Sequence, residues 1–141
     1  MTKFNGRRLS WQHNLGQCIV KGYFPSGVKE LSVSLFQAVI LLQFNDTDEL
    51  TVENLKSRTT MCKSLVVVYA WYLHICMYVG EKELTRSLLS LSSGKFKILK
   101  KSGSGKDVAD DDVFTVDSTF KAKLYRIKIN AIQVSQAYTH T

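Results

Sequence analysis

The chain begins and ends with segments in which apolar and polar side chains alternate, as in a strand with one buried face. Residues 9–24 contain two extended runs separated by Asn14 and Gly16, which favour a turn, so we expect a β-hairpin there. A turn at residues 25–27 ends the hairpin, and a short extended piece follows at residues 29–33.

Two segments in the middle of the chain have helical character. Residues 34–44 place apolar side chains on most sides of a helix, so we expect this helix to be the most buried element. The second helix starts after Thr51, whose hydroxyl can cap it, and Glu53 brings a negative charge to its positive end. We expect this helix to run through Leu55 to about Arg58.

A third helix is predicted from residue 81 onward. Leu84, Leu88 and Leu91 recur at the spacing of one helix face, and Gly94 is well placed to end the helix. Extended runs at residues 96–99 and 113–116 then flank a flexible SGSGK turn. Three helices followed by such a ribbon are the element order of a winged helix.

The last strand is expected within residues 124–134, where apolar and mainly basic positions alternate. Because such a strand is not stable alone, we expect it to pair with the N-terminal hairpin. The predicted fold class is therefore α+β, a winged-helix three-helix unit packed with a small β-sheet. The expected domain spans residues 6–134, followed by a tail at residues 135–141.

The composition indicates one globular domain. The 141 residues carry 19 Lys and Arg against 12 Asp and Glu, a formal charge of +7 that suits acidic partners of several kinds. Cys18, Cys62 and Cys76 lack paired spacing, so we expect reduced thiols. Without a secretory-type N-terminus, we expect a cytoplasmic or nuclear location.

No motif indicates an enzyme, a cofactor or a metal site. Residues 102–107 lack the glycine and the Ser or Thr of a phosphate loop, and the adjacent acidic residues 110–112 diverge in a solvated turn. Cys62, His74 and Cys76 match no zinc spacing. His13 has no evident nucleophile beside it, so we interpret it as a packed histidine.

Nucleic-acid binding is the rival function, because winged helices often place their third helix in the major groove. Cations surround that helix, but its exposed positions are mainly Glu, Ser and Thr, which favours a protein-facing surface. The cations are Lys82, Arg86, Lys95, Lys97, Lys100 and Lys101.

Several blocks follow one another along the chain, namely GRRLSWQHNLGQCIVKGYF, KELSVSLFQAVILLQFN, LTVENLKSRT, KELTRSLLSLSSGK, GKDVADDDVF and KLYRIKIN. In this order they resemble the C-terminal homology region of cullins, and among cullins they are most similar to the cullin-4 type. In cullins this region forms an α/β sheet and a winged helix that hold a RING-box subunit of a ubiquitin ligase. The resemblance therefore implies a non-catalytic scaffold in ubiquitin-dependent protein catabolism, which would not itself transfer ubiquitin.

The RING-box protein of cullins adds an extended strand to the sheet, so an open sheet edge is the expected binding site, with residues 9–15, 18–24 and 125–129 as alternative acceptor strands. The resemblance places the sheet portion at residues 7–30 and 113–134 and the winged-helix portion at residues 31–101. The candidate partner-binding residues are Leu9, Trp11, His13, Tyr125, Ile127 and Ile129.

Departures from the family pattern shape the remaining expectations. The adaptor-binding helical repeats and the second winged helix with the modifier-acceptor lysine have no counterpart here, so we expect a truncated scaffold without adaptor binding or modifier attachment. Residues 60–79 form an apolar insert, and the uninterrupted run at residues 65–79 is short for a membrane span. An extra buried helix or strand, and translated non-coding sequence in a non-functional gene product, are the other interpretations.

Overall fold

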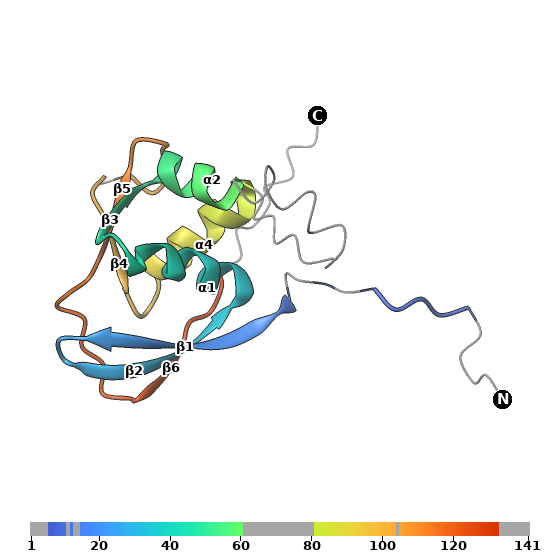
Figure 1. Ribbon diagram of the computed structural model, residues 1–141, viewed down its shortest axis with the longest axis horizontal. Coiled ribbons are helices and arrows are strands. Elements are labelled where there is room, and N and C mark those ends of the chain that lie inside the picture. Colours follow the sequence, from blue (N-terminus) through green and yellow to red (C-terminus); the bar gives the residue numbers. More distant parts are fainter. Residues whose placement is uncertain (1–5, 11, 13–14, 61–80, 104, 133–141) are drawn as a thin grey trace.

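A computed structural model describes residues 6–10, 12, 15–60, 81–103 and 105–132. Within them, two three-stranded sheets flank a group of helices, which confirms the α+β class. Figure 1 shows the first sheet below α1 and α4, and the second sheet beside α2. Of the apolar insert predicted at residues 60–79, the structure describes only Thr60, which is the last residue of α2 (Val52–Thr60).

The first sheet begins with a hairpin of β1 (Gln17–Phe24) and β2 (Gly27–Ser34), paired antiparallel from Phe24↔Gly27 to Gln17↔Ser34. The hairpin predicted over residues 9–24 is therefore wrong, because its second strand, β1, pairs with β2, the segment that follows it. The physical reason is the tight turn at Pro25 and Ser26. Gly27 follows this turn with a backbone φ of 122°, a conformation that favours glycine.

The last strand, β6 (Arg126–Lys128), lies parallel to β2 and completes the sheet order β1-β2-β6. The last strand therefore pairs with β2, which lies outside the hairpin predicted over residues 9–24, so the expected partner is wrong and the strand is shorter than predicted. Two flanking hydrogen bonds extend the pairing, from Glu30 N–H to Tyr125 C=O at 2.9 Å and from Ile129 N–H to Ser32 C=O at 3.0 Å.

The helices follow the sequence pattern closely at their starts. Ser34 caps α1 (Leu35–Leu42), and Thr51 caps α2 by accepting a hydrogen bond from the Asn54 N–H at 3.1 Å. A short 3-10 helix, η2 (Gln43–Asn45), follows α1, and α4 (Glu81–Ser93) is the third predicted helix. The sequence predicts that α1 is buried on most sides, but the helix is less buried than this, because Leu42 is 53% exposed.

The second sheet contains β3 (Glu49–Thr51), β4 (Leu99–Lys101) and β5 (Val113–Val116) in the order β3-β5-β4. This corrects the expected division of the domain, which grouped residues 113–134 with the first sheet. The two-stranded ribbon predicted from residues 96–99 and 113–116 has β3 as a third strand, because Leu50 of β3 pairs with Phe114 of β5. The expected boundary at residue 31 also falls inside β2.

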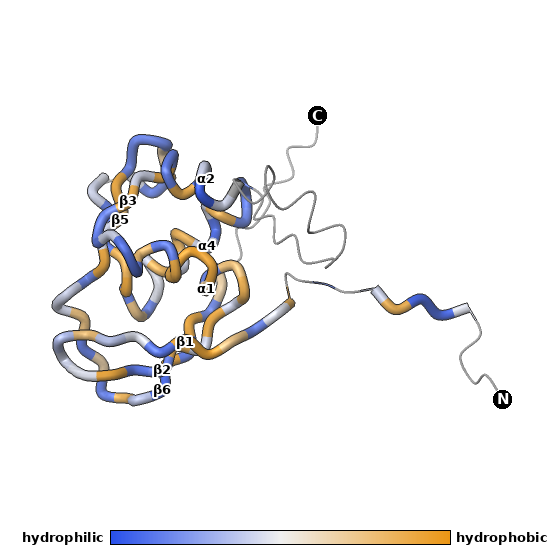
Figure 2. Tube along the Cα trace, in the orientation of Figure 1, coloured by the Kyte–Doolittle hydropathy of each residue, from blue (hydrophilic) through white to orange (hydrophobic). Residues whose placement is uncertain are grey.

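The core is shared by both sheets and the helices between them. Figure 2 shows apolar positions concentrated along α1 and α4, where the predicted face of Leu84, Leu88 and Leu91 is buried. The buried apolar residues are Leu31, Val33, Phe36, Ala38, Ile40, Phe44, Leu50, Val52, Leu55, Leu84, Leu88, Leu91, Ile98, Leu99, Phe114, Phe120, Ile127 and Ile129. In the part of the chain that the structure describes, no helix has the length and apolar character needed to cross a membrane.

Candidate functional site

The first sheet has two outer strands, and β1 is the longer of them. It has 8 residues, and among the described residues only β2 pairs with it. An outer strand carries backbone N–H and C=O groups without a partner in its own sheet, and these can pair with an added strand. This edge of β1 is therefore the candidate functional site.

The hydrogen-bond pattern shows which residues of β1 turn their backbone outward. The Leu35 N–H donates to Gly16 C=O at 2.9 Å, one step beyond the Gln17↔Ser34 pair. Bonded and non-bonded pairs alternate in an antiparallel ladder, so the even-numbered residues of β1 bond to β2. Gln17, Ile19, Lys21 and Tyr23 are left facing the open edge.

The partners of β2 on its other side confirm this alternation independently. Glu30 and Ser32 bond to the β6 side through their backbone, as the hydrogen bonds to Tyr125 and Ile129 show. These are the residues that lie opposite Lys21 and Ile19 in the hairpin register. The outward direction of the odd-numbered β1 residues therefore rests on two sets of hydrogen bonds.

The side chains of β1 divide between the two faces of the sheet. Cys18, Val20 and Phe24 pack against the core, whereas Ile19 is 54% and Tyr23 80% exposed on the opposite, outer face. Gly22 faces the core without a side chain, and a Cβ there would lie 2.6 Å from the Phe24 ring. The edge thus offers exposed apolar contacts on one face, and on the other face the Phe24 ring fills the space beside Gly22.

A groove of about 280 Å³ with both apolar and polar lining residues lies next to β1 on the core side. It separates β1 from the end of α1, from η2 and from the second sheet. A strand added to β1 would direct every second side chain toward this groove. The groove is lined by Val20, Lys21, Gly22, Tyr23, Phe24, Leu31, Leu41, Phe44, Asn45, Asp48, Ile98 and Val116.

The opposite edge, at β6, is less suited to strand addition. It is 3 residues long, and the side chains on its outer face are the cations Arg126 and Lys128. Arg126 is held by Glu30 of β2, with its Nη2 2.8 Å and its Nε 2.9 Å from Oε2. Short strands and edge charges both discourage further pairing, so β1 is the better acceptor.

The residues predicted for partner binding do not gather at one place. Leu9 is 89% exposed and outside any strand, and Trp11 and His13 lie outside the described residues. Tyr125 is 54% exposed, which corrects its predicted inward position in the strand. Ile127 and Ile129 are buried in the protein's own core, so the structure assigns their side chains to packing.

The outward residues of the edge are absent from that set, although residues 18–24 are one of the three expected acceptor strands. Within residues 17–24 the outward side chains Ile19 and Tyr23 alternate with the inward Val20 and Phe24. Because both sets contain large apolar residues, simple alternation of polarity does not reveal them. The turn signal of Pro25, Ser26 and Gly27 is the feature that could have set the register.

The other side chains considered for metal binding or catalysis are engaged in local interactions. Asp112 lies 3.0 Å from Lys101, while Asp110 contacts Lys56, so these two carboxylates point to different cations. The Lys56 pKa is raised by its hydrogen bonds to Asp110 and Glu81. Cys18 is a free cysteine whose thiol pKa is raised by burial, which keeps the thiol protonated at neutral pH.

The basic side chains proposed for DNA are partly neutralised. Lys100 lies 2.8 Å from Asp117, Lys101 pairs with Asp112, and Arg86 pairs with Glu83 at 3.3 Å. Cations already bound to carboxylates are less available to phosphates. The described surface around α4 is therefore less suited to binding nucleic acid than the count of basic residues in the sequence indicates.

Comparison with known proteins shows similarity to cullins. The sequence model described as the cullin alpha+beta domain matches residues 1–73. Human Cullin-4A is 40% identical over 134 residues, Cullin-4 of Schizosaccharomyces pombe 37% over 139, and Cullin-3A of Arabidopsis thaliana 34% over 129. These alignments cover 95%, 96% and 90% of this chain but only 15%, 16% and 15% of the respective relatives.

Proposed function

Because the chain belongs to the cullin family, we propose that it is a non-catalytic scaffold of a cullin-RING ubiquitin ligase. Its part would be to bind a RING-box subunit in ubiquitin-dependent protein catabolism. The RING-box subunit would add an extended segment to the open edge of β1. In this proposal, the rest of the fold serves to hold that edge in place.

The observation that supports the proposal is the open edge of 8 residues beside a groove that several apolar side chains line. Backbone pairing with Gln17, Ile19, Lys21 and Tyr23 would supply affinity, and each hydrogen bond contributes roughly 0.5–1.5 kcal/mol net. Apolar side chains entering the groove would supply specificity, because only alternate positions of the added strand point there.

The groove is kept in place by the core on both sides of it. Leu31 and Phe44, two of its lining residues, are buried, and Phe24 contacts Phe120 with ring centroids 4.9 Å apart. Ser26 adds a link across the same region, since its hydroxyl donates to the Phe120 C=O at 2.7 Å. The β1 edge is thereby fixed relative to the groove before any partner arrives, which lowers the ordering cost of binding.

Lys21→Pro tests the proposal. Proline removes the outward N–H of residue 21 and places its ring toward the added strand, but it breaks no hydrogen bond to β2. We expect RING-box binding to weaken at least about tenfold, the equivalent of about 1.4 kcal/mol, in isothermal titration calorimetry. The thermal unfolding midpoint should stay close to that of the unmodified chain.

Lys21→Ala is the matched control, because it removes the charge and keeps the N–H. Its affinity for the RING-box subunit should stay within about twofold of the unmodified chain, since an exposed charge contributes little. A folded Lys21→Pro protein with full RING-box affinity would refute binding at the β1 edge. Equal weakening by both substitutions would show that the lysine charge, and not strand addition, is responsible.

A further inference from the structure

A second concave region lies at the other end of the first sheet and is separate from the β1 groove. It has a volume of about 310 Å³ and lies where β1 begins, β2 ends and the chain leaves β6. We call it the polar hollow. It is lined by Leu15, Gly16, Gln17, Ser32, Val33, Ser34, Lys128, Ile129, Asn130 and Ala131.

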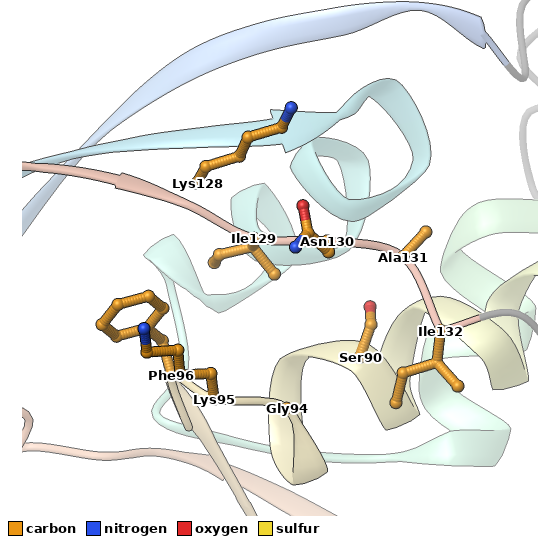
Figure 3. Close-up of a pocket in the computed structure, with 9 residues that line it drawn as sticks. All are labelled: Ser90, Gly94, Lys95, Phe96, Lys128, Ile129, Asn130, Ala131 and Ile132. Atoms are coloured by element: carbon orange, nitrogen blue, oxygen red, sulfur yellow. The ribbon is translucent and has the colours of Figure 1, made fainter.

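Hydrogen-bond donors from three parts of the sheet meet at the polar hollow. The register places Gln17 opposite Ser34 and Ser32 opposite Lys128, so these side chains share the outer face. Figure 3 shows Lys128 and Asn130 pointing to the side of the chain away from Ser90 and Ile132. Alternation along the strand explains this, since the intervening Ile129 enters the core.

These donors are not used by the fold. Among the described residues, the side chains of Gln17, Ser32, Lys128 and Asn130 make no hydrogen bond or ion pair. Ser34 accepts a hydrogen bond from the Gln37 N–H at 3.2 Å, which leaves its hydroxyl proton to donate. The polar hollow therefore combines an ammonium group, two amides and two hydroxyls that can all donate.

The electrostatic surroundings favour an anion. Among the residues that the structure describes, no Asp or Glu lines the polar hollow. The acidic residue on the outer face of β2 is Glu30, and Arg126 already neutralises it at 2.8 Å. An anion entering the polar hollow would thus meet Lys128 without competition from a lining carboxylate.

We propose that the polar hollow binds the phosphoryl group of a phosphorylated serine or threonine in a partner peptide. A phosphoryl group presents three acceptor oxygens and a charge near −2, which suits donors arriving from several directions better than a planar carboxylate does. The peptide chain is indicated by the rim, where Leu15 is exposed and can contact a neighbouring apolar residue. This surface shares Gln17 with the edge proposed for the RING-box subunit, which would use the backbone of that residue, and its other lining residues lie outside that edge.

Fluorescence anisotropy with a labelled peptide tests the proposal on the full chain. The probe carries a central phosphoserine between leucines, and the comparison peptides carry serine or glutamate at that position. The phosphopeptide should bind at least about tenfold more tightly than the serine peptide, because charge-assisted hydrogen bonds are worth this much. Lys128→Gln should weaken phosphopeptide binding about tenfold.

Lys123→Gln is the control, since Lys123 is exposed and lies outside the polar hollow. It should leave phosphopeptide affinity within about twofold, as expected for a surface charge. Asn130→Asp provides a second variant at an exposed position, and its carboxylate should repel the phosphoryl group. RING-box binding should not change in any of these variants, so this proposal and the scaffold proposal can fail separately.

Four outcomes would overturn the assignment. Binding of the serine peptide as tight as that of the phosphopeptide would remove the phosphoryl group from the recognition. Equal affinity for the glutamate peptide would identify a carboxylate as the ligand. Equal losses in the Lys123 and Lys128 variants would indicate a diffuse charge effect, and displacement of the peptide by an equal concentration of inorganic phosphate would exclude a role for the peptide chain.

Discussion

A buried amide, Gln37, connects the start of α1 to α4, and its removal should destabilise the protein measurably. The Gln37 side chain is 0% exposed. Its Oε1 accepts from the Ser34 N–H at 2.9 Å, and its Nε2 donates to the Ser90 Oγ at 2.7 Å. Ser90 in turn donates to the Ser87 C=O at 2.7 Å. Gln37 therefore completes the cap of α1 and holds α1 against α4.

Gln37→Leu keeps a side chain of similar volume and removes both amide hydrogen bonds. Each lost bond costs about 1 kcal/mol, and the Ser34 N–H left without an acceptor costs roughly 1 kcal/mol more. The added apolar burial offsets part of this. We expect a net loss of about 2 kcal/mol in the free energy of unfolding.

Urea denaturation followed by circular dichroism measures this loss, and the dependence on urea concentration should keep its slope. Ser90→Ala leaves the Gln37 Nε2 unpaired, so it should also destabilise the protein, by about 1–2 kcal/mol. The double variant should lose less than the sum of the two, because it removes both ends of the Gln37–Ser90 hydrogen bond and leaves neither of these two ends unpaired. Strictly additive losses, or a loss below about 0.5 kcal/mol for Gln37→Leu, would refute this account of the buried network.

Two further predictions concern the core and the pH dependence of stability. Leu88→Ala should cost about 3 kcal/mol in urea unfolding, because Leu88 is fully buried, whereas Leu42→Ala at an exposed helix position should cost less than about 1 kcal/mol. The Asp117 pKa is lowered from 3.8 to about 2 by hydrogen bonds from Lys100 and Thr119. Its contribution to stability is therefore present above pH 3.8 and lost as the pH falls toward 2. Asp117→Asn should flatten the stability profile in that interval, and an unchanged slope in acid denaturation would contradict the assignment.

Helix positions were predictable because their signals are local. Thr51 lies directly before α2, and Leu84, Leu88 and Leu91 recur at helical spacing. Such signals depend on hydrogen bonds and side-chain contacts between residues three or four apart. The sequence therefore predicted the helix starts and the buried face of α4 correctly.

The burial of individual residues was less accessible to sequence reasoning. Gln37 is a polar residue in an apolar helix, and only Ser90, 53 positions away, explains its complete burial. Tyr125 follows the apolar alternation of β6, yet it lies just before the strand and is exposed. Periodicity describes a regular element, but it does not show where that element ends or which neighbours cover it.

By itself, the sequence determined the family, the α+β class and the order of the helices, because these depend on ordered motifs and local periodicity. The tertiary structure decided which strands pair and therefore which edge stays open. Strand pairing joins β2 to β6, whose paired residues Glu30 and Arg126 are 96 positions apart in the chain. Side-chain alternation alone does not choose between registers of the same parity. The open backbone of β1 and the donors of the polar hollow exist only after that long-range pairing has formed.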